Sequence, residues 1–195
     1  MKLTFFGAMA ALLSTIFLQG CAGAVVGGAA AGGLTAHDQR SVGVVVDDES
    51  IELQAQTEYF KSAKLRDNAH LNFTSYNGLL LITGEAPTQE LKSLATSVVR
   101  DIDKVRRVQN EVVIASPSTM LLRSSDTYLT AKVKTSLVRV DGMPDFDPTR
   151  VKIVSENGTV FLMGLLSRSE GDAITNHTRQ IGGVQRVVKV FEYVQ

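Results

Sequence analysis

The chain of 195 residues has a single cysteine, Cys21, only four prolines and no excess of either charge. One cysteine excludes an intrachain disulfide, a cysteine-based zinc site and a CxxC redox pair. Lysines and arginines equal aspartates and glutamates at 20 each, so the chain has no positive excess of the kind that binds nucleic-acid phosphates. The hydrophobic content of 44% suits one modest domain or two very small ones. We therefore predict a folded protein that does not bind nucleic acid.

Recognisable catalytic motifs are also missing from the sequence. A hydrolase needs a nucleophile, a nearby base and an oxyanion site, but no HExxH, GxSxG, Walker or GxGxxG pattern occurs. His37 precedes the folded region, His70 begins a predicted strand, and His177 lies on an apolar helix face, which is typical of a core histidine. The aspartates of residues 141–147 lack the central glycine and later glutamate of an EF-hand. We predict no catalytic residue, no metal site and no cofactor.

The N-terminal segment has the pattern of a secretory signal. Lys2 is followed by an apolar run over residues 3–18, shorter than the ~20 residues that span a bilayer. The next residues, Leu18-Gln19-Gly20-Cys21, resemble the lipobox of bacterial lipoproteins. This resemblance implies cleavage after residue 20 and acylation of Cys21, and Ala22 in the following position implies the outer membrane. The alternative is an uncleaved anchor followed by a free or buried thiol.

Residues 21–46 combine this cysteine with a stretch rich in glycine and alanine. Such a composition buries too little surface to offset its ordering entropy, so we predict a flexible tether. The glycine spacing is also close to the small-xxx-small pattern of helices that pack in lipid, which is the alternative.

A ten-residue phrase occurs twice, as SYNGLLLITG in residues 75–84 and as SENGTVFLMG in residues 155–164. Asn-Gly between apolar runs predicts a β-hairpin with a tight type I′ turn, and we expect Gly164 to end its strand. A helical pattern at i, i+4, i+8 precedes each hairpin, and we expect Asp48 or Ser50 and Asp126 to cap these helices. The apolar positions are Ile51, Ala55 and Tyr59 in the first helix and Leu129, Val133 and Leu137 in the second.

A second helix and a third strand follow each hairpin, and Ser167 to Glu170 form a predicted capping box. A right-handed crossover would make the third strand parallel, giving an α+β fold of two tandem αββαβ units. Each unit is expected to be a three-stranded mixed sheet with two helices on one face. The predicted segments are a cleaved signal peptide in 1–20, the lipidated cysteine and tether in 21–46, a first domain in 47–115, a linker in 116–124 and a second domain in 125–195.

This repeated unit resembles the BON domain, named for bacterial osmotically induced and nodulation proteins. Four segments carry the resemblance: Asn77 to Gly84, Asn157 to Gly164, Val105 to Val108 and Val184 to Val187. Together with the lipobox they resemble dual-BON lipoproteins of Gram-negative outer membranes, facing the periplasm. The resemblance implies a non-catalytic module that binds phospholipid or envelope partners and supports outer-membrane integrity and outer-membrane protein assembly.

Charge divides unevenly between the two repeats. Residues 47–116 contain eight basic and eleven acidic side chains, and residues 123–195 contain ten and eight. We therefore expect the second domain to meet anionic phospholipid of the inner leaflet of the outer membrane. The candidate contacts, expected to converge at one end of that domain, are Tyr128, Lys132, Leu165, Leu166, Arg168 and Ile174.

Each of these residues also has a structural interpretation. Tyr128 can cover the edge of the core, and Leu165 and Leu166, predicted to follow the strand, can close the next helix against the sheet. An alternative function is a protein-protein adaptor whose exposed sheet faces dock an envelope protein, such as a component of the outer-membrane assembly machinery.

Overall fold

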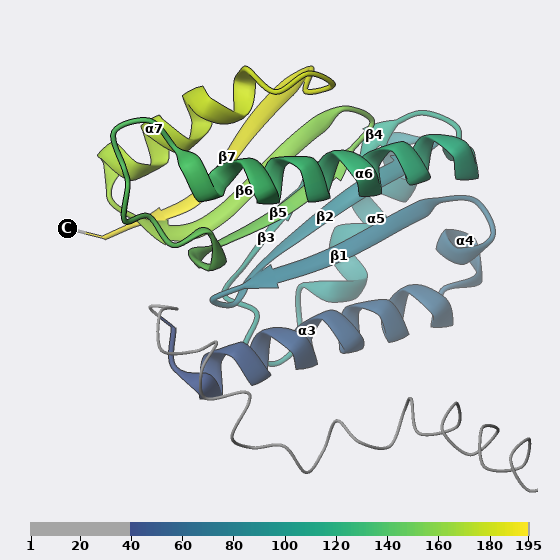
Figure 1. The fold of residues 1–195 in the computed structure, drawn as a ribbon. Coiled ribbons are helices and arrows are strands. Elements are labelled where there is room, and N and C mark those ends of the chain that lie inside the picture. The colour runs from purple at the N-terminus through teal and green to yellow at the C-terminus, as the bar shows by residue number, and fades with distance from the viewer. Residues whose placement is uncertain (1–39, 195) are drawn as a thin grey trace, which may run out of the picture. The chain divides into compact units, whose positions relative to one another are not determined.

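The computed structural model describes residues 40–194, which form two successive units of the same topology (Figure 1). The elements of the first unit are α3 (Val42–Lys61), α4 (Ala63–Arg66), β1 (His70–Tyr76), β2 (Leu79–Ala86), α5 (Gln89–Val99), β3 (Arg107–Asn110) and β4 (Val113–Ile114). The elements of the second unit are α6 (Met120–Ser136), the 3-10 turns η2 (Leu137–Arg139) and η3 (Pro148–Arg150), β5 (Val151–Glu156), β6 (Thr159–Leu166), α7 (Arg168–Arg179) and β7 (Arg186–Tyr193).

Both sheets have the predicted mixed pairing. β1 runs antiparallel to β2, and β3 and β4 both pair in parallel with β2 as two pieces of one edge. β6 likewise pairs antiparallel with β5 and parallel with β7. Both Asn-Gly pairs have positive φ, with 52° and 73° at Asn77 and Gly78 and 48° and 70° at Asn157 and Gly158. These values confirm the two tight hairpins.

One face of each sheet is covered by its unit's helices, as predicted. In the first unit Ile51, Ala55 and Tyr59 of α3 are buried with side chains of β1, β2 and α5. In the second unit the apolar stripe of α6 packs in the same way against β5 and β6. Burial of these stripes is the main stabilisation of the helices, since each large side chain contributes ~1.5–3 kcal/mol.

The opposite faces of the two sheets pack against each other. This contact, called the sheet interface below, includes the buried side chains of Tyr76, Leu79, Leu81, Phe161, Met163 and Val190. All eight residues of β2 are buried, because its alternating side chains point into two different cores. The expectation that the sheet faces are exposed for docking a partner is therefore wrong for these two faces.

Two predicted irregular segments contain helix. α3 begins at Val42, inside the predicted tether 21–46, with the Ser41 hydroxyl accepting from Val44 N at 3.3 Å. α6 begins at Met120, inside the predicted linker 116–124. The signal peptide, Cys21 and the rest of the tether up to residue 39 lie outside the described residues. Within residues 40–194, none of the helices combines the length and apolar character needed to cross a bilayer.

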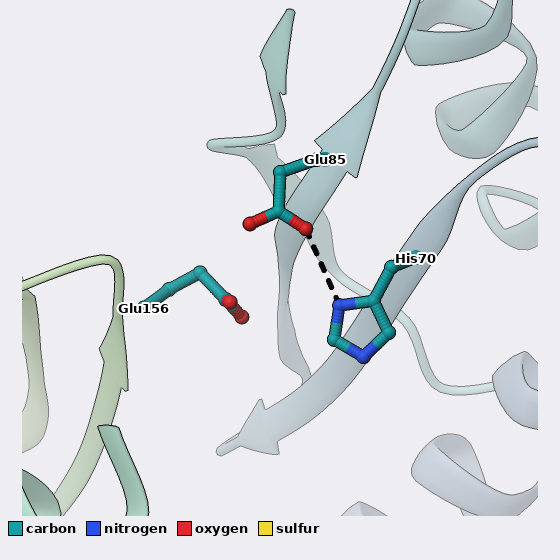
Figure 2. Close-up of side chains that lie close together, drawn as sticks. All are labelled: His70, Glu85 and Glu156. Atoms are coloured by element: carbon teal, nitrogen blue, oxygen red, sulfur yellow. Dashed lines mark ion pairs between the residues drawn. The ribbon is translucent and has the colours of Figure 1, made fainter. Parts of the chain in front are cut away.

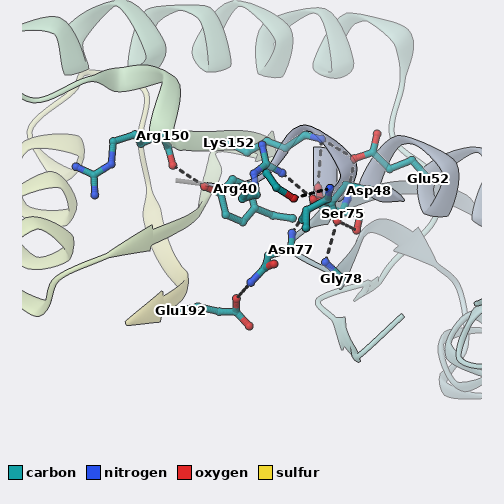
Figure 3. Close-up of polar contacts among 12 residues, drawn as sticks. Arg40, Asp48, Glu52, Ser75, Asn77, Gly78, Arg150, Lys152 and Glu192 are labelled. Carbon is teal, nitrogen blue, oxygen red and sulfur yellow. Dashed lines mark hydrogen bonds and ion pairs between the residues drawn. The ribbon is translucent and has the colours of Figure 1, made fainter. Parts of the chain in front are cut away.

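Asp48 and Asp126 lie within α3 and α6 and do not cap them. The Asp48 carboxylate instead accepts from the backbone N–H groups of Asn77 and Gly78, at 2.7 and 2.8 Å (Figure 3). Asp126 accepts from the same two positions of the second hairpin, at 2.9 and 3.1 Å. The prediction that they cap helices was wrong because each carboxylate tethers a hairpin turn to the helix that covers it.

The glycine that closes each repeated phrase lies inside its strand. β6 continues past Gly164 to Leu166, so the expectation that Gly164 ends the strand was wrong. A Cβ at Gly164 would lie 2.9 Å from the Arg150 carbonyl oxygen, and one at Gly84, whose φ is 112°, would lie 2.0 Å from that of His70. Glycine is required at both positions because the neighbouring strand approaches too closely for a side chain.

Candidate functional site

Tyr128 and Lys132 lie one turn apart on the outer side of α6. The Tyr128 side chain is 69% exposed, and Lys132 Nζ donates to the Gly182 carbonyl at 2.7 Å. This bond ties α6 to the loop before β7. Tyr128 also lines a cleft of about 490 Å³ between α6, the second hairpin turn and that loop. An exposed aromatic ring with a polar tip beside a lysine stem suits an interface between water and lipid.

The other four predicted contact residues do not join this pair. Leu165 and Leu166 are the last residues of β6 and do not follow it in an exposed loop. Leu166 and Ile174 are fully buried in the core of the second unit, so neither side chain contacts lipid in this conformation. Leu165 packs on the sheet interface.

Arg168 lies at the far end of the second unit from Tyr128. Its guanidinium is 4.8 Å from the centre of the Tyr193 ring. Tyr128 is beside the turn that precedes β6, whereas Arg168 follows the end of that strand. Eight residues at ~3.3 Å each separate these ends. The predicted convergence was wrong because Tyr128 lies beside the start of β6, whereas Leu165, Leu166 and Arg168 lie at or just after its end.

Reciprocal asparagine contacts link the two units around the sheet interface. The Asn77 side-chain amide donates to Glu192 of the second unit, and the Asn157 amide donates to Glu85 of the first. Arg106 also bonds to Glu192, at 2.5 Å. Asn therefore has two roles at each turn, since it tolerates the positive φ and supplies a donor to the other unit.

Further polar contacts lie along the same interface (Figure 3). Lys152 Nζ of β5 donates to the Glu52 carboxylate of α3 at 2.6 Å and to the Ser75 carbonyl at 3.3 Å. The Tyr76 hydroxyl donates to the Arg150 carbonyl at 3.1 Å. These bonds surround the apolar side chains and fix the register of one sheet on the other.

One cluster at the interface contains titratable side chains from both units (Figure 2). His70 and Glu85 are paired neighbours on β1 and β2, and Glu156 ends β5. Glu85 and Glu156 are 1% and 6% exposed. Burial lowers the pKa of His70, helped by Arg123 and opposed by Glu85. Burial also raises the pKa of Glu156 to about 7, where the Asn72 hydrogen bond opposes it and the Glu85 and Asp126 carboxylates add to it.

Sequence reasoning missed this cluster. His70 was identified only as the start of a strand, and the hairpin register would have placed Glu85 opposite it. Glu156 is separated from them by more than 70 residues and comes close only because the sheets pack face to face. His177, by contrast, is a partly buried residue of α7, and its Nε2 has no hydrogen-bond partner among residues 40–194.

Comparison with known proteins agrees with this architecture. The BON domain matches the chain twice, over residues 47–116 and 125–195. The chain is 37% identical to "Outer membrane lipoprotein DolP" of Haemophilus influenzae over 93% of its own length and 92% of that protein. It is also 34% identical to "21 kDa hemolysin" of Actinobacillus pleuropneumoniae, covering 81% of the chain and 80% of that protein.

A solved structure of CdsD, a structural protein of the type III secretion system of Chlamydia trachomatis, gives a weaker match. Its sequence identity is 16% and its TM-score is 0.29, with 75% of this chain and 63% of that chain covered. A likeness of this size carries no conclusion. The two BON matches and the 37% identity over most of the chain establish the family. The chain belongs to the BON-domain family and contains two tandem copies of that domain.

Proposed function

We propose that this protein is a non-enzymatic lipoprotein, anchored through Cys21 in the outer membrane and facing the periplasm. Its second BON domain binds anionic phospholipid of the inner leaflet through the outer side of α6, and the protein thereby supports outer-membrane integrity. The Leu-Gln-Gly-Cys motif supports the anchor. Similarity to a protein named as an outer-membrane lipoprotein supports the location.

The observation that carries the lipid proposal is the exposure of Tyr128 on α6. A large ring that is 69% exposed contributes little by burial in the core, but it can enter the headgroup region while its hydroxyl stays hydrated. Lys132 lies one turn away and supplies positive charge. One aromatic and one lysine bind weakly by themselves, but an acyl anchor holds the domain at a high effective concentration of lipid.

Flotation with the unacylated chain from residue 22 tests this proposal. Vesicles of phosphatidylcholine alone are compared with vesicles that also contain phosphatidylglycerol. We expect flotation only with the anionic vesicles, weakening as salt is added, because surface-charge attraction is screened. The variants Tyr128→Ser and Lys132→Gln should each reduce it several-fold.

Phe60 gives a matched control in the first domain. It is another exposed aromatic on the first helix of a BON domain, at 53% exposure. The variant Phe60→Ser should float like the wild type. Equal flotation of the Tyr128 variant and the wild type would contradict the proposal, as would flotation independent of phosphatidylglycerol.

A second candidate function is docking of an outer-membrane assembly component by the first domain. Val42, Val46, Leu53 and Phe60 are all more than half exposed. Their spacing of four, seven and seven residues places them along one stripe of α3. An exposed apolar stripe of this kind is typical of a helix that lies in a partner's groove. In this alternative the partner docks on the α3 stripe and not on the sheet faces, which the two domains bury against each other.

The two candidates separate in one experiment. A photo-crosslinking residue placed at Leu53 should capture an outer-membrane protein if the first domain is an adaptor, and the same residue at Tyr128 should capture phospholipid. Crosslinking at Leu53 that is abolished by Val46→Ser supports docking. If no protein adduct forms at Leu53 and flotation depends on Tyr128, lipid binding is the function that the experiments support.

A further inference from the structure

Three side chains with metal-ligating atoms meet where the two BON domains join (Figure 2). His70 and Glu85 face each other on paired strands of the first domain, and Glu156 approaches them from the second. One ligand atom from each lies within 4.8 Å of the others. This cluster belongs neither to the outer side of α6 nor to the stripe on α3.

The two glutamates are buried, and the only basic side chain paired with either of them in residues 40–194 is His70, whose Nδ1 is 3.4 Å from Glu85 Oε2. Within residues 40–194 no lysine or arginine forms a salt bridge with Glu85 or Glu156. Arg123 lines the adjacent cavity, but its guanidinium bonds to the Ser118 carbonyl at 2.8 Å. Two charged carboxylates buried this close together are costly unless one of them takes up a proton or a cation lies between them.

The histidine nitrogen gives a second observation. His70 Nδ1 is buried yet forms no hydrogen bond with any residue that the structure describes. Glu85 Oε2, which also accepts from Ser118 N at 3.2 Å, is 3.4 Å away, an ion-pair distance longer than the usual N–H···O length of about 2.7–3.2 Å. Two ligands on a tetrahedral zinc ion, at ~2.0–2.1 Å from the metal, are separated by about the same 3.4 Å. An unsatisfied buried nitrogen at this spacing points to a metal ligand.

Amide side chains orient both carboxylates from outside the cluster. Asn72 Nδ2 donates to Glu156 Oε2 at 2.9 Å, and Asn157 Nδ2 donates to Glu85 Oε1. Each of these bonds crosses between the domains. Hydrogen bonds of this kind hold ligating carboxylates in place around a metal, and they leave the second oxygen of Glu156 available for coordination.

We propose that His70, Glu85 and Glu156 form a Zn²⁺ site that bridges the two BON domains. One imidazole and two carboxylates match zinc better than calcium or magnesium, which favour six or more oxygen ligands. A cavity of about 380 Å³, lined by His70 and Glu156 among others, opens beside the cluster. It gives the ion an entry path and leaves room for a water molecule in the fourth position.

Calorimetric titration of ZnCl₂ into the tag-free, chelator-treated chain tests the site. We expect one Zn²⁺ per chain and a melting temperature that rises with added Zn²⁺, because the ion binds the docked native state. His70→Asn and Glu156→Gln each remove one ligand and should weaken binding at least about ten-fold. Glu156→Gln also keeps an acceptor for Asn72, so it decides the outcome if the His70 variant does not fold.

Glu192→Gln is the matched control. Glu192 also joins the two domains, through Asn77 and Arg106, but lies outside the cluster. This variant should bind Zn²⁺ like the wild type, and the histidine ¹⁵N spectrum should show the Zn²⁺-induced shift at His70. The proposal is overturned if the wild type takes up no Zn²⁺, if Glu156→Gln binds equally well, or if His37 or His177 carries the shift.

Discussion

Asp48 and Asp126 show how one residue type ties a helix to a distant hairpin. Each lies at the same place in its repeat and accepts from the backbone N–H groups of an Asn-Gly turn about 30 residues later. Asp48 has two more partners, the Ser75 hydroxyl and Arg40, both at 2.7 Å. A buried carboxylate that satisfies turn amides fixes both the turn and the helix position.

Replacing these aspartates should destabilise the protein unequally. Asp48→Ala leaves two turn amides, a hydroxyl and an arginine without their acceptor, so we expect the free energy of unfolding to fall by about 3 kcal/mol or more. Asp126→Ala removes two bonds and should cost about 2 kcal/mol. Urea denaturation followed by circular dichroism measures both losses.

The exposed Asp101 serves as the control. Its side chain is 84% exposed and, within residues 40–194, pairs only with its neighbour Arg100, so Asp101→Ala should change stability very little. If the Asp48 and Asp126 variants lose no more free energy of unfolding than this control, the hydrogen bonds to the turns do not contribute to stability.

Sequence reasoning placed these aspartates correctly near helices but gave them the wrong partner. Aspartate before an apolar helical pattern is typical of an N-cap. The true cap of α3 is Ser41, and the acceptors that Asp48 satisfies lie on a hairpin. Sequence spacing predicts hydrogen bonds only to amides a few residues away. The turn amides that Asp48 binds are about 30 residues away and come close to the helix only in the folded chain.

At the scale of the element, α7 shows a local signal that sequence did identify. The predicted capping box is present, because the Ser167 hydroxyl accepts from Glu170 N while the Glu170 carboxylate accepts from Ser167 N. Glu170 also accepts from Arg150 at 2.7 Å. The start of α7 is thereby attached to the residue that precedes β5.

The Glu170 carboxylate should make stability depend on acid pH. Burial raises its pKa, but hydrogen bonds from Arg150 and Ser167 outweigh burial and leave the pKa below the ordinary value of 4.5. A depressed pKa in the folded state adds stability above pH 4.5 that is lost as pH falls through the folded value. Glu170→Gln should therefore be less stable than wild type by about 1 kcal/mol at pH 7, and the difference should shrink below pH 4.5.

Thermal unfolding across this pH range measures the effect. Glu90 is the control, since it also lies in the first turn of a helix but is 73% exposed with Lys64 as its partner. Glu90→Gln should show almost no difference from wild type at any pH. A stability gap for Glu170→Gln that stays constant from pH 7 to acid would rule out the carboxylate's charge as its source.

The elements themselves were largely predictable because their signals are local. The repeated Asn-Gly phrase gave both hairpins, and apolar residues at i, i+4, i+8 gave the first helix of each domain. The ends of elements were less accessible. β6 continues through Gly164, where the backbone passes so close to the Arg150 carbonyl that no side chain fits. The sequence alone does not distinguish a glycine inside a strand from one that ends it.

At the scale of the whole molecule, the sheet interface makes the two BON domains one body. Leu79, Leu81, Phe161 and Met163 are almost completely buried, although each lies on the side of its sheet that faces away from the helices. The continuous apolar run of β2 is typical of a strand buried on both faces. The face of β2 that points away from the helices is covered by the sheet of the other repeat, so its burial cannot be predicted from one repeat alone.

The same packing explains why the His70, Glu85 and Glu156 cluster was invisible in the sequence. Glu85 and Glu156 follow apolar or small residues near strand ends, where acidic side chains are normally solvated. They are buried because each domain covers the other's strand end, so a site made by two repeats needs the structure to be found.

Truncation of Phe161 should test whether the domains fold as one unit. The ring is 2% exposed within the sheet interface, so Phe161→Ala should lower the free energy of unfolding by about 3–5 kcal/mol. We expect the wild type to unfold in a single calorimetric transition, since separating the sheets would expose the buried faces of both. The variant should instead show two transitions, with increased amide hydrogen exchange in β2 of the other domain.

Phe60→Ala, which truncates an exposed ring, should leave the single transition in place. Two transitions in the wild type, or unchanged exchange in β2 of the Phe161 variant, would mean that each domain owes its stability to its own helices alone.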